Sequence, residues 1–158
     1  MRSIEEYFLY TKASRLRADY TYISDGAVLI RKDNLDSDLL KNYRTQPDNL
    51  MTYIPFERGN EYKLPNYVYL HPKKRLFFEI DKDFSVDYRF IEIFMENFED
   101  LTFTTVDMYI NNDLLKIVKV WQGGNVFIGC IACAKVFEYY SPDAYFNYGL
   151  YAKEEVQA

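Results

Sequence analysis

The spacing of hydrophobic and polar residues predicts a chain of mixed helix and strand. Near the N-terminus, Ser3 and Glu6 have the spacing of a capping box, in which each side chain accepts a hydrogen bond from an exposed main-chain N–H group. Leu9, Ala13 and Leu16 then recur at i, i+4 and i+7, the pattern of the buried side of an amphipathic helix. We therefore predict a helix that begins at Ser3.

Two later segments also have helical spacing. Residues 85–100 place apolar side chains along one side and several glutamates elsewhere. Residues 112–121 begin with an asparagine suited to an N-cap, end before Gly123-Gly124, and carry apolar residues at i, i+3, i+4 and i+7: Leu114, Ile117, Val118 and Trp121. A strand is disfavoured there, because Lys116 and Lys119 would point to opposite faces of a sheet. We predict a helix in each segment.

Runs of β-branched and aromatic residues, separated by turn residues, predict several strands. Asp25-Gly26 lies between two such runs and indicates a hairpin. A second hairpin is predicted from residues 67–70 to residues 75–80. Further strands are predicted at residues 101–110, 126–137 and 148–151. The predicted fold class is therefore α+β, with two to three amphipathic helices packed on a mostly antiparallel β-sheet.

The length of the chain predicts one domain over residues 1–152, followed by a polar C-terminal tail at residues 153–158. A chain of 158 residues and 18.9 kDa has the size of a single domain. Prolines and a glycine interrupt residues 33–66, which we interpret as an irregular insertion. The N-terminus lacks the pattern of a signal peptide, and the longest apolar run is far shorter than the roughly 20 residues that span a bilayer. These features predict a cytoplasmic protein without membrane contact.

Aromatic side chains dominate the composition, whereas catalytic side chains are scarce. The chain has 16 Tyr, 12 Phe and 1 Trp but a single histidine, His71. No phosphate-binding loop, dinucleotide motif, nucleophile elbow or zinc-ligand spacing occurs. Cys130 and Cys133 have CxxC spacing, but on a strand they would face opposite sides and act as core residues. Because aromatic residues anchor interfaces, we predict recognition rather than catalysis: no enzymatic activity, no cofactor and no metal site.

Basic side chains gather in three places on an acidic chain, whose net charge is -5. Two predicted helices each carry a pair at i, i+3, a spacing that suits contact with a DNA phosphate backbone: Lys12 with Arg15, and Lys116 with Lys119. The turn of the second predicted hairpin would form an interaction tip for a phosphate or an acidic partner: His71, Lys73, Lys74 and Arg75. Solvated surfaces carry the same patterns, so the residues alone leave both interpretations open.

Three segments together resemble DNA sliding clamps (processivity factors), especially the divergent clamp-like proteins of phages and mobile elements. They are the hairpin at residues 23–30 that follows a helix, the strand that leads into a helix at residues 109–118, and the closing strands at 126–137 and 148–151. The resemblance implies two helices over an antiparallel sheet, with Lys12, Arg15, Lys116 and Lys119 turned toward encircled DNA. The acidic helix at residues 85–100 and the insertion depart from the family's pattern, and a ring would require several copies of the chain.

Two functions of different classes follow. One is a non-catalytic accessory protein of DNA replication or repair that resembles a sliding-clamp domain and binds DNA or a replication protein. To surround DNA it would require a homo-oligomer or a partner protein. The alternative is a small phage or mobile-element inhibitor or adaptor that binds a host protein through exposed aromatic residues. Exposed aromatic patches without a basic concave face would favour the alternative, although aromatic residues also accumulate in proteins from AT-rich genomes.

Overall fold

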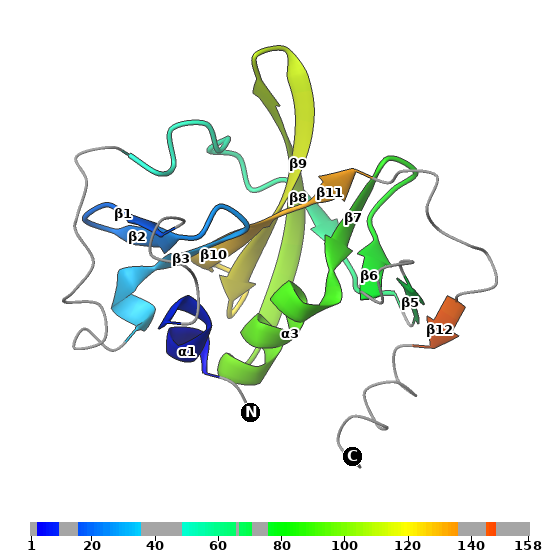
Figure 1. The fold of residues 1–158 in the computed structure, drawn as a ribbon, viewed down its shortest axis with the longest axis horizontal. Helices are drawn as coiled ribbons and strands as arrows, with labels where there is room; N and C mark the ends of the chain where they lie inside the picture. Colours follow the sequence, from blue (N-terminus) through cyan, green and yellow to red (C-terminus); the bar gives the residue numbers. More distant parts are fainter. Residues whose placement is uncertain are drawn as a thin grey trace.

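Two antiparallel sheets build the part of the chain that the computed structural model describes, which comprises residues 3–9, 16–35, 49–65, 67–70, 76–135 and 145–147 (Figure 1). In these residues the protein is α+β and dominated by antiparallel sheet, with two α-helices, α1 (Ile4–Leu9) and α3 (Tyr88–Asn97). A 3-10 helix, η2, spans Lys32–Asn34.

The larger sheet has seven strands in the order β1-β2-β3-β10-β9-β8-β4. Their bounds are β1 (Arg17–Ala18), β2 (Tyr22–Ser24), β3 (Val28–Arg31), β10 (Val126–Ala132), β9 (Asp113–Gln122), β8 (Leu101–Ile110) and β4 (Asn60–Tyr62). The smaller sheet has the order β11-β7-β6-β5-β12. Its strands are β11 (Ala134–Lys135), β7 (Phe84–Asp87), β6 (Leu76–Glu79), β5 (Tyr67–Leu70) and β12 (Tyr145–Asn147).

The prediction of a helix at residues 112–121 is wrong, because this segment forms β9. β9 pairs with β8 along the full length of both strands, from Leu101↔Gln122 to Ile110↔Asp113. Asn111 and Asn112 have φ angles of 52° and 66°, the left-handed pair that a type I′ turn requires. Asn112 is therefore a turn residue rather than an N-cap. Gly123 and Gly124, expected to stop a helix, turn the chain from β9 into β10 with φ angles of 61° and 81°.

Other predicted elements are present with shifted ends. The hairpin at Asp25-Gly26 is confirmed, and the Asp25 carboxylate accepts hydrogen bonds from the N–H groups of Ala27 and Val28 at 2.9 and 2.8 Å. The second helix begins at Tyr88 instead of Ser85, because Asp87 caps it by accepting from the Arg89 N–H group at 2.9 Å.

The first predicted helix is present as α1, which Ser3 caps by accepting a hydrogen bond from the Glu6 N–H group at 3.1 Å. Its continuation past Leu9 lies outside the described residues, as does the strand predicted at residues 148–151. Within the predicted insertion, residues 49–65 are described and include β4.

The larger sheet is covered on both faces, by two separate apolar clusters. On one face, α1, α3 and the smaller sheet enclose the main core, whose largest buried side chains include Phe8, Phe78 and Phe94. On the other face, Leu29, Val106, Ile117 and Cys130 form a smaller buried cluster. The cover of this second face is the chain segment before β4, drawn in teal in Figure 1.

Candidate protein-interaction site

Residues 49–59, which we call the aromatic loop, pack on the second face of the larger sheet and also present side chains to solvent. Leu50, Met51 and Ile54 lie against the smaller apolar cluster. Tyr53 and Phe56 lie between or beside these positions yet remain 65% and 103% exposed. The loop therefore has an inward apolar side that contributes to the core and an outward aromatic side that does not.

Short turns inside the loop produce this division. The Asn49 carbonyl accepts hydrogen bonds from the N–H group and the hydroxyl of Thr52, at 3.2 and 2.6 Å. The Asn49 side chain accepts from the Met51 N–H group at 2.9 Å, and the Met51 carbonyl accepts from the Ile54 N–H group at 3.1 Å. These short-range hydrogen bonds, from both main chain and side chains, give the segment defined turns although it belongs to no helix or strand.

Asp19 holds the beginning of the loop. This carboxylate is buried and accepts hydrogen bonds from the N–H groups of Thr21, Tyr22 and Leu50 at 2.8, 2.6 and 2.9 Å. Burial on its own would raise the pKa of Asp19, but these three hydrogen bonds, led by that from Leu50, and the charge of Lys32 hold it below its ordinary value. A charged group thus joins the β1–β2 turn to the loop.

Lys119, on β9 of the larger sheet, holds the middle of the loop against the sheet. The residue is 3% exposed, and its ammonium group donates to the carbonyl oxygens of Pro55 and Glu57, each at 2.5 Å, with the Phe127 ring centre 6.0 Å away. Burial lowers the pKa of Lys119 below its ordinary value. This lysine therefore faces the inside of the aromatic loop, and its two carbonyl partners flank Phe56 in the sequence.

A third set of contacts holds the end of the loop. The Thr104 hydroxyl donates to the Arg58 carbonyl at 2.6 Å and accepts from the Trp121 indole N–H group at 2.8 Å. The Arg58 guanidinium lies 4.5 Å from the centre of the Trp121 ring, within range of a cation–π contact. Trp121 is partly buried here, instead of lying on the buried side of a helix as its spacing predicted.

The two lysines that were predicted to share a basic face do not lie together. Lys116 is on the opposite face of β9 from Lys119, where its ammonium lies 2.6 Å from Asp81 and 3.4 Å from Asp107. Burial alone would lower the pKa of Lys116, but the hydrogen bond and charge of Asp81, with Asp107, raise it. The remaining predicted contact residues lie outside the described part of the chain: Lys12, Arg15, His71, Lys73, Lys74 and Arg75.

The cysteines occupy the separate positions that the strand spacing predicted. Both thiols are free, Cys130 in the smaller apolar cluster and Cys133 against the main core. Burial raises the pKa of each thiol to about 12, so both are protonated at neutral pH. In the residues that the structure describes, no group of three or more His, Cys, Asp or Glu side chains could hold a metal ion.

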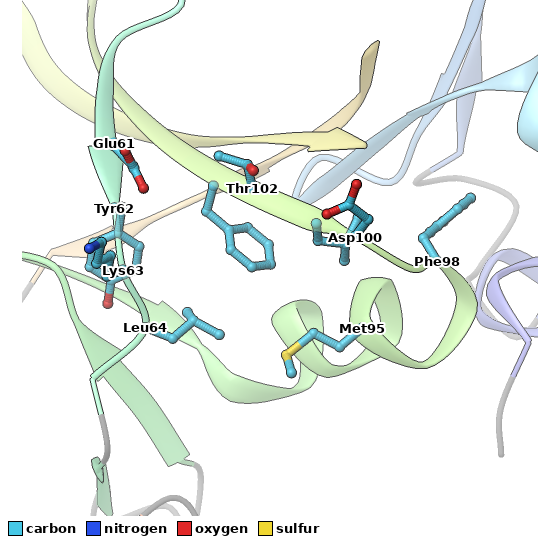
Figure 2. Close-up of a pocket in the computed structure, with 10 residues that line it drawn as sticks. Glu61, Tyr62, Lys63, Leu64, Met95, Phe98, Asp100 and Thr102 are labelled. Atoms are coloured by element: carbon cyan, nitrogen blue, oxygen red, sulfur yellow. The ribbon is translucent and has the colours of Figure 1, made fainter. Parts of the chain in front are cut away.

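A cleft of about 440 Å³ lies between the end of α3 and the strand edge formed by β4 and the start of β8. Figure 2 shows Leu64 and Met95 on opposite sides of it, with Thr102 and Asp100 along the chain that enters β8. The hydroxyl of Tyr62, also in the lining, donates to the Glu79 carbonyl at 2.6 Å. The lining combines apolar residues with three exposed charged residues, Glu61, Lys63 and Asp100.

Comparison with known proteins gives no family for this chain. No family model, no curated protein and no solved structure matches it. In the described residues, none of the helices is long and apolar enough to span a membrane.

Sequence reasoning missed the aromatic loop because it falls in the segment interpreted as an irregular insertion. Its local signal is Tyr53 and Phe56 among turn-forming residues, and neither aromatic belongs to a helical or alternating pattern.

Proposed function

We propose that this protein is a non-catalytic binding module that docks on another protein through the aromatic loop, with Tyr53 and Phe56 as the anchoring side chains. The observation that carries this proposal is the full exposure of Phe56 on a loop held from beneath by Lys119 and at its start by Asp19. An exposed phenyl ring is stabilised when it is removed from water, so Phe56 is well placed to be buried against a partner protein.

Rigidity of the loop supports the same proposal. Ordering a flexible loop on binding costs free energy, and that cost is reduced when the loop already has its bound conformation. Contacts to Asp19, Lys119 and Thr104 hold three points of the aromatic loop, spread over its length. The exposed aromatic side chains therefore lie on a pre-ordered segment, which is the arrangement expected of an interface anchor.

We expect the partner to be a folded protein with an apolar pocket of side-chain size. The phenyl ring carries no hydrogen-bonding group, so apolar contact is its main means of binding. Tyr20, 88% exposed, follows Asp19 in the sequence and lies on the turn that is joined to the loop through Leu50. Tyr20 would extend the aromatic contact at its margin.

Binding to DNA and a clamp-like assembly stay predictions from the resemblance. Lys116 and Lys119 give them no support, because their ammonium groups are engaged by carboxylates and by main-chain carbonyls within the molecule. A lysine with such partners releases no counterion from a phosphate backbone unless its internal contacts break first. The exposed aromatic loop favours the protein-binding alternative.

Site-specific photo-crosslinking in the cells that naturally make this protein tests the proposal. A photoreactive phenylalanine analogue replaces Phe56, and in a matched chain it replaces Glu96, an exposed residue of α3. We expect one discrete crosslinked protein from position 56 and none of the same mass from position 96. The same product from both positions would contradict the proposal.

The second part of the test is the affinity of this protein for the partner that crosslinking identifies, after that partner has been purified. We expect Phe56→Ala to weaken binding by about 30-fold or more, the size of an interface hot spot. Its melting temperature should stay unchanged because the side chain is fully exposed. Val126→Ala, which truncates another exposed apolar side chain, is the control and should bind as the natural chain does. Equal affinity of Phe56→Ala and the natural chain would refute the role of the loop.

A further inference from the structure

The outer edge of β8 is open over half of its length. β8 pairs with β9 along all ten of its residues, but on its other side it pairs with β4 only from Phe103 to Thr105. Residues 106–110 have no strand partner on that side in the part of the chain that the structure describes. Figure 1 shows the end of the β8–β9 hairpin extending beyond the rest of the described chain.

Gly59 marks the point at which the cover of this edge ends. Its φ angle is 90°, and it turns the chain away from β8 just before β4 begins. A hollow of about 260 Å³ follows beside the edge, lined among others by Glu57, Asn60 and Asp107. Gly59 itself lies against Thr105 and Val106, since a Cβ atom added to it would be 2.2 Å from the Thr105 carbonyl oxygen and 2.5 Å from the Val106 side chain. The aromatic loop then crosses to the second face of the sheet, and within the described residues no strand runs along the edge of residues 107–110.

This edge lacks the features that usually prevent strand pairing. Free edges are commonly protected by lysine, proline or a bulge. Residues 106–110 contain neither lysine nor proline, and their pairing with β9 runs without a register shift. The single charge, on Asp107, lies 3.4 Å from the ammonium group of Lys116 in the same hairpin. The neighbouring Tyr109 is 66% exposed.

The hairpin turn fixes which main-chain groups face outward. A two-residue turn is closed by a hydrogen-bonded pair, here Ile110 and Asp113. Hydrogen-bonded and non-hydrogen-bonded pairs alternate along an antiparallel ladder, so Met108 also directs its N–H and C=O groups toward β9. Asp107 and Tyr109 then direct theirs to the open edge, and these are the groups that a further strand would engage.

We propose that a second copy of this chain pairs with the open edge, antiparallel and about a two-fold axis through Met108. In this register Asp107 of each copy forms a hydrogen-bonded pair with Tyr109 of the other. Met108 meets its own counterpart, and Val106 meets Ile110 on the same face of the joined sheet. The two contacting surfaces are identical, as a two-fold interface requires.

Self-complementarity selects a second copy as the occupant and selects this register. An axis through Asp107 would bring two carboxylates together and would require Tyr109 to occupy the place opposite Thr105 that Asn60 already fills. An axis through Tyr109 would leave only residues 108–110 opposite each other. The axis through Met108 sets apolar residues opposite apolar ones and each acid opposite a tyrosine, and its outermost pair, Val106 with Ile110, abuts Gly59.

A cysteine scan of the full chain tests this register. The two Met108 positions form a non-hydrogen-bonded pair, whose Cα atoms are about 4.5 Å apart in antiparallel sheets, within the range of a disulfide. The two Ile110 positions would be roughly 13 Å apart along the strands. We expect a reducible dimer from Met108→Cys under mild oxidation, and none from Ile110→Cys or the natural chain. Equal dimer from both variants, or none from Met108→Cys, would overturn the register.

Charge substitution at one exposed position gives an independent measurement. Tyr109→Asp places a carboxylate opposite Asp107 of the other copy, whereas Tyr109→Lys places an ammonium group there. Sedimentation equilibrium at low salt should give a dimer dissociation constant at least tenfold weaker for Tyr109→Asp than for Tyr109→Lys, with the gap narrowing as salt is added. A natural chain that stays monomeric up to millimolar concentration, or two variants with equal constants, would refute the dimer. Neither measurement involves Tyr53 or Phe56, so its failure leaves the proposed function untouched.

Discussion

Replacement of Lys119 by methionine is the sharpest test of how the aromatic loop is held. Methionine retains the apolar stem of the lysine, which packs in the sheet, but it cannot donate to the carbonyl groups of Pro55 and Glu57. The substitution therefore removes the contact beneath the loop while it leaves the volume of the buried side chain nearly unchanged.

The two hydrogen bonds set the scale of the effect. A hydrogen bond from a charged donor contributes about 1.5–3 kcal/mol, so two of them contribute roughly 3–6 kcal/mol. Methionine also avoids the cost of burying an ammonium group, and this offsets a part of the loss. Pro55 is half-buried and Glu57 is exposed, so water can reach their carbonyl groups once the loop moves. We expect the free energy of unfolding to fall by about 1–3 kcal/mol.

Denaturant unfolding measures the global loss, and amide hydrogen exchange locates it. The N–H groups of Leu50, Thr52 and Ile54 donate hydrogen bonds inside or beneath the loop, and their exchange should accelerate at least tenfold in Lys119→Met. Lys116→Met is the matched control, because Lys116 is on the same strand but faces Asp81 and Asp107 on the opposite side. It should lose stability without faster exchange in the loop.

The reasoning would be refuted if Lys119→Met kept both the natural stability and the natural exchange rates at these three amides. Equal acceleration of loop exchange in both lysine variants would also refute it, because the effect would then be a general loosening of β9 and not the loss of one anchor.

Three further predictions concern the turns and the anchor at Asp19. Folding lowers the pKa of Asp19, so its contribution to the free energy of unfolding is present above the ordinary value of 3.8 and is lost as the pH falls through the folded-state pKa. In denaturant unfolding, the stability of Asp19→Asn should therefore depend less on pH below about 4 than that of the natural chain. Gly59→Ala should destabilise by more than about 2 kcal/mol, since it adds a Cβ atom 2.2 Å from the Thr105 carbonyl oxygen at a φ angle of 90°. Gly26→Ala, with a φ angle of 93° and open space, isolates the conformational cost, and equal melting temperatures of the two variants would contradict the steric argument. Asn112→Val should lower the free energy of unfolding by about 1–2 kcal/mol in denaturant, because valine disfavours positive φ, whereas Asn112→Gly should be neutral or stabilising. Similar losses for the two variants would argue against the type I′ turn.

Local signals predicted those elements whose causes are local. The Asp25-Gly26 hairpin depends on hydrogen bonds between residues two or three positions apart, which a sequence displays directly. The second helix was predicted from its apolar spacing, but its start was placed at Ser85 instead of after the Asp87 cap. The β8–β9 hairpin was missed because Leu114, Ile117, Val118 and Trp121 fit helical spacing as well as a strand. The deciding signal was Asn111-Asn112, an adjacent pair that tolerates left-handed conformations.

The rule that lysine avoids buried strand faces also misled the prediction. Lys119 can be buried because carbonyl groups 62 and 64 positions away in the chain accept hydrogen bonds from its ammonium group. Leu50 likewise meets Asp19 across 31 positions. The order of the aromatic loop arises from such distant contacts, so the sequence placed Tyr53 and Phe56 in an irregular segment and gave no sign of what holds them.

The division of the aromatic loop into inward and outward side chains has a consequence for how this protein can change over time. Leu50, Met51 and Ile54 are constrained by the cluster that they cover, whereas Tyr53 and Phe56 have no role in the core. Substitutions at the outward positions can therefore alter which surface is recognised at little expense in stability, as in the hypervariable loops of an antibody. The loop is a place where recognition can diversify while the scaffold stays the same.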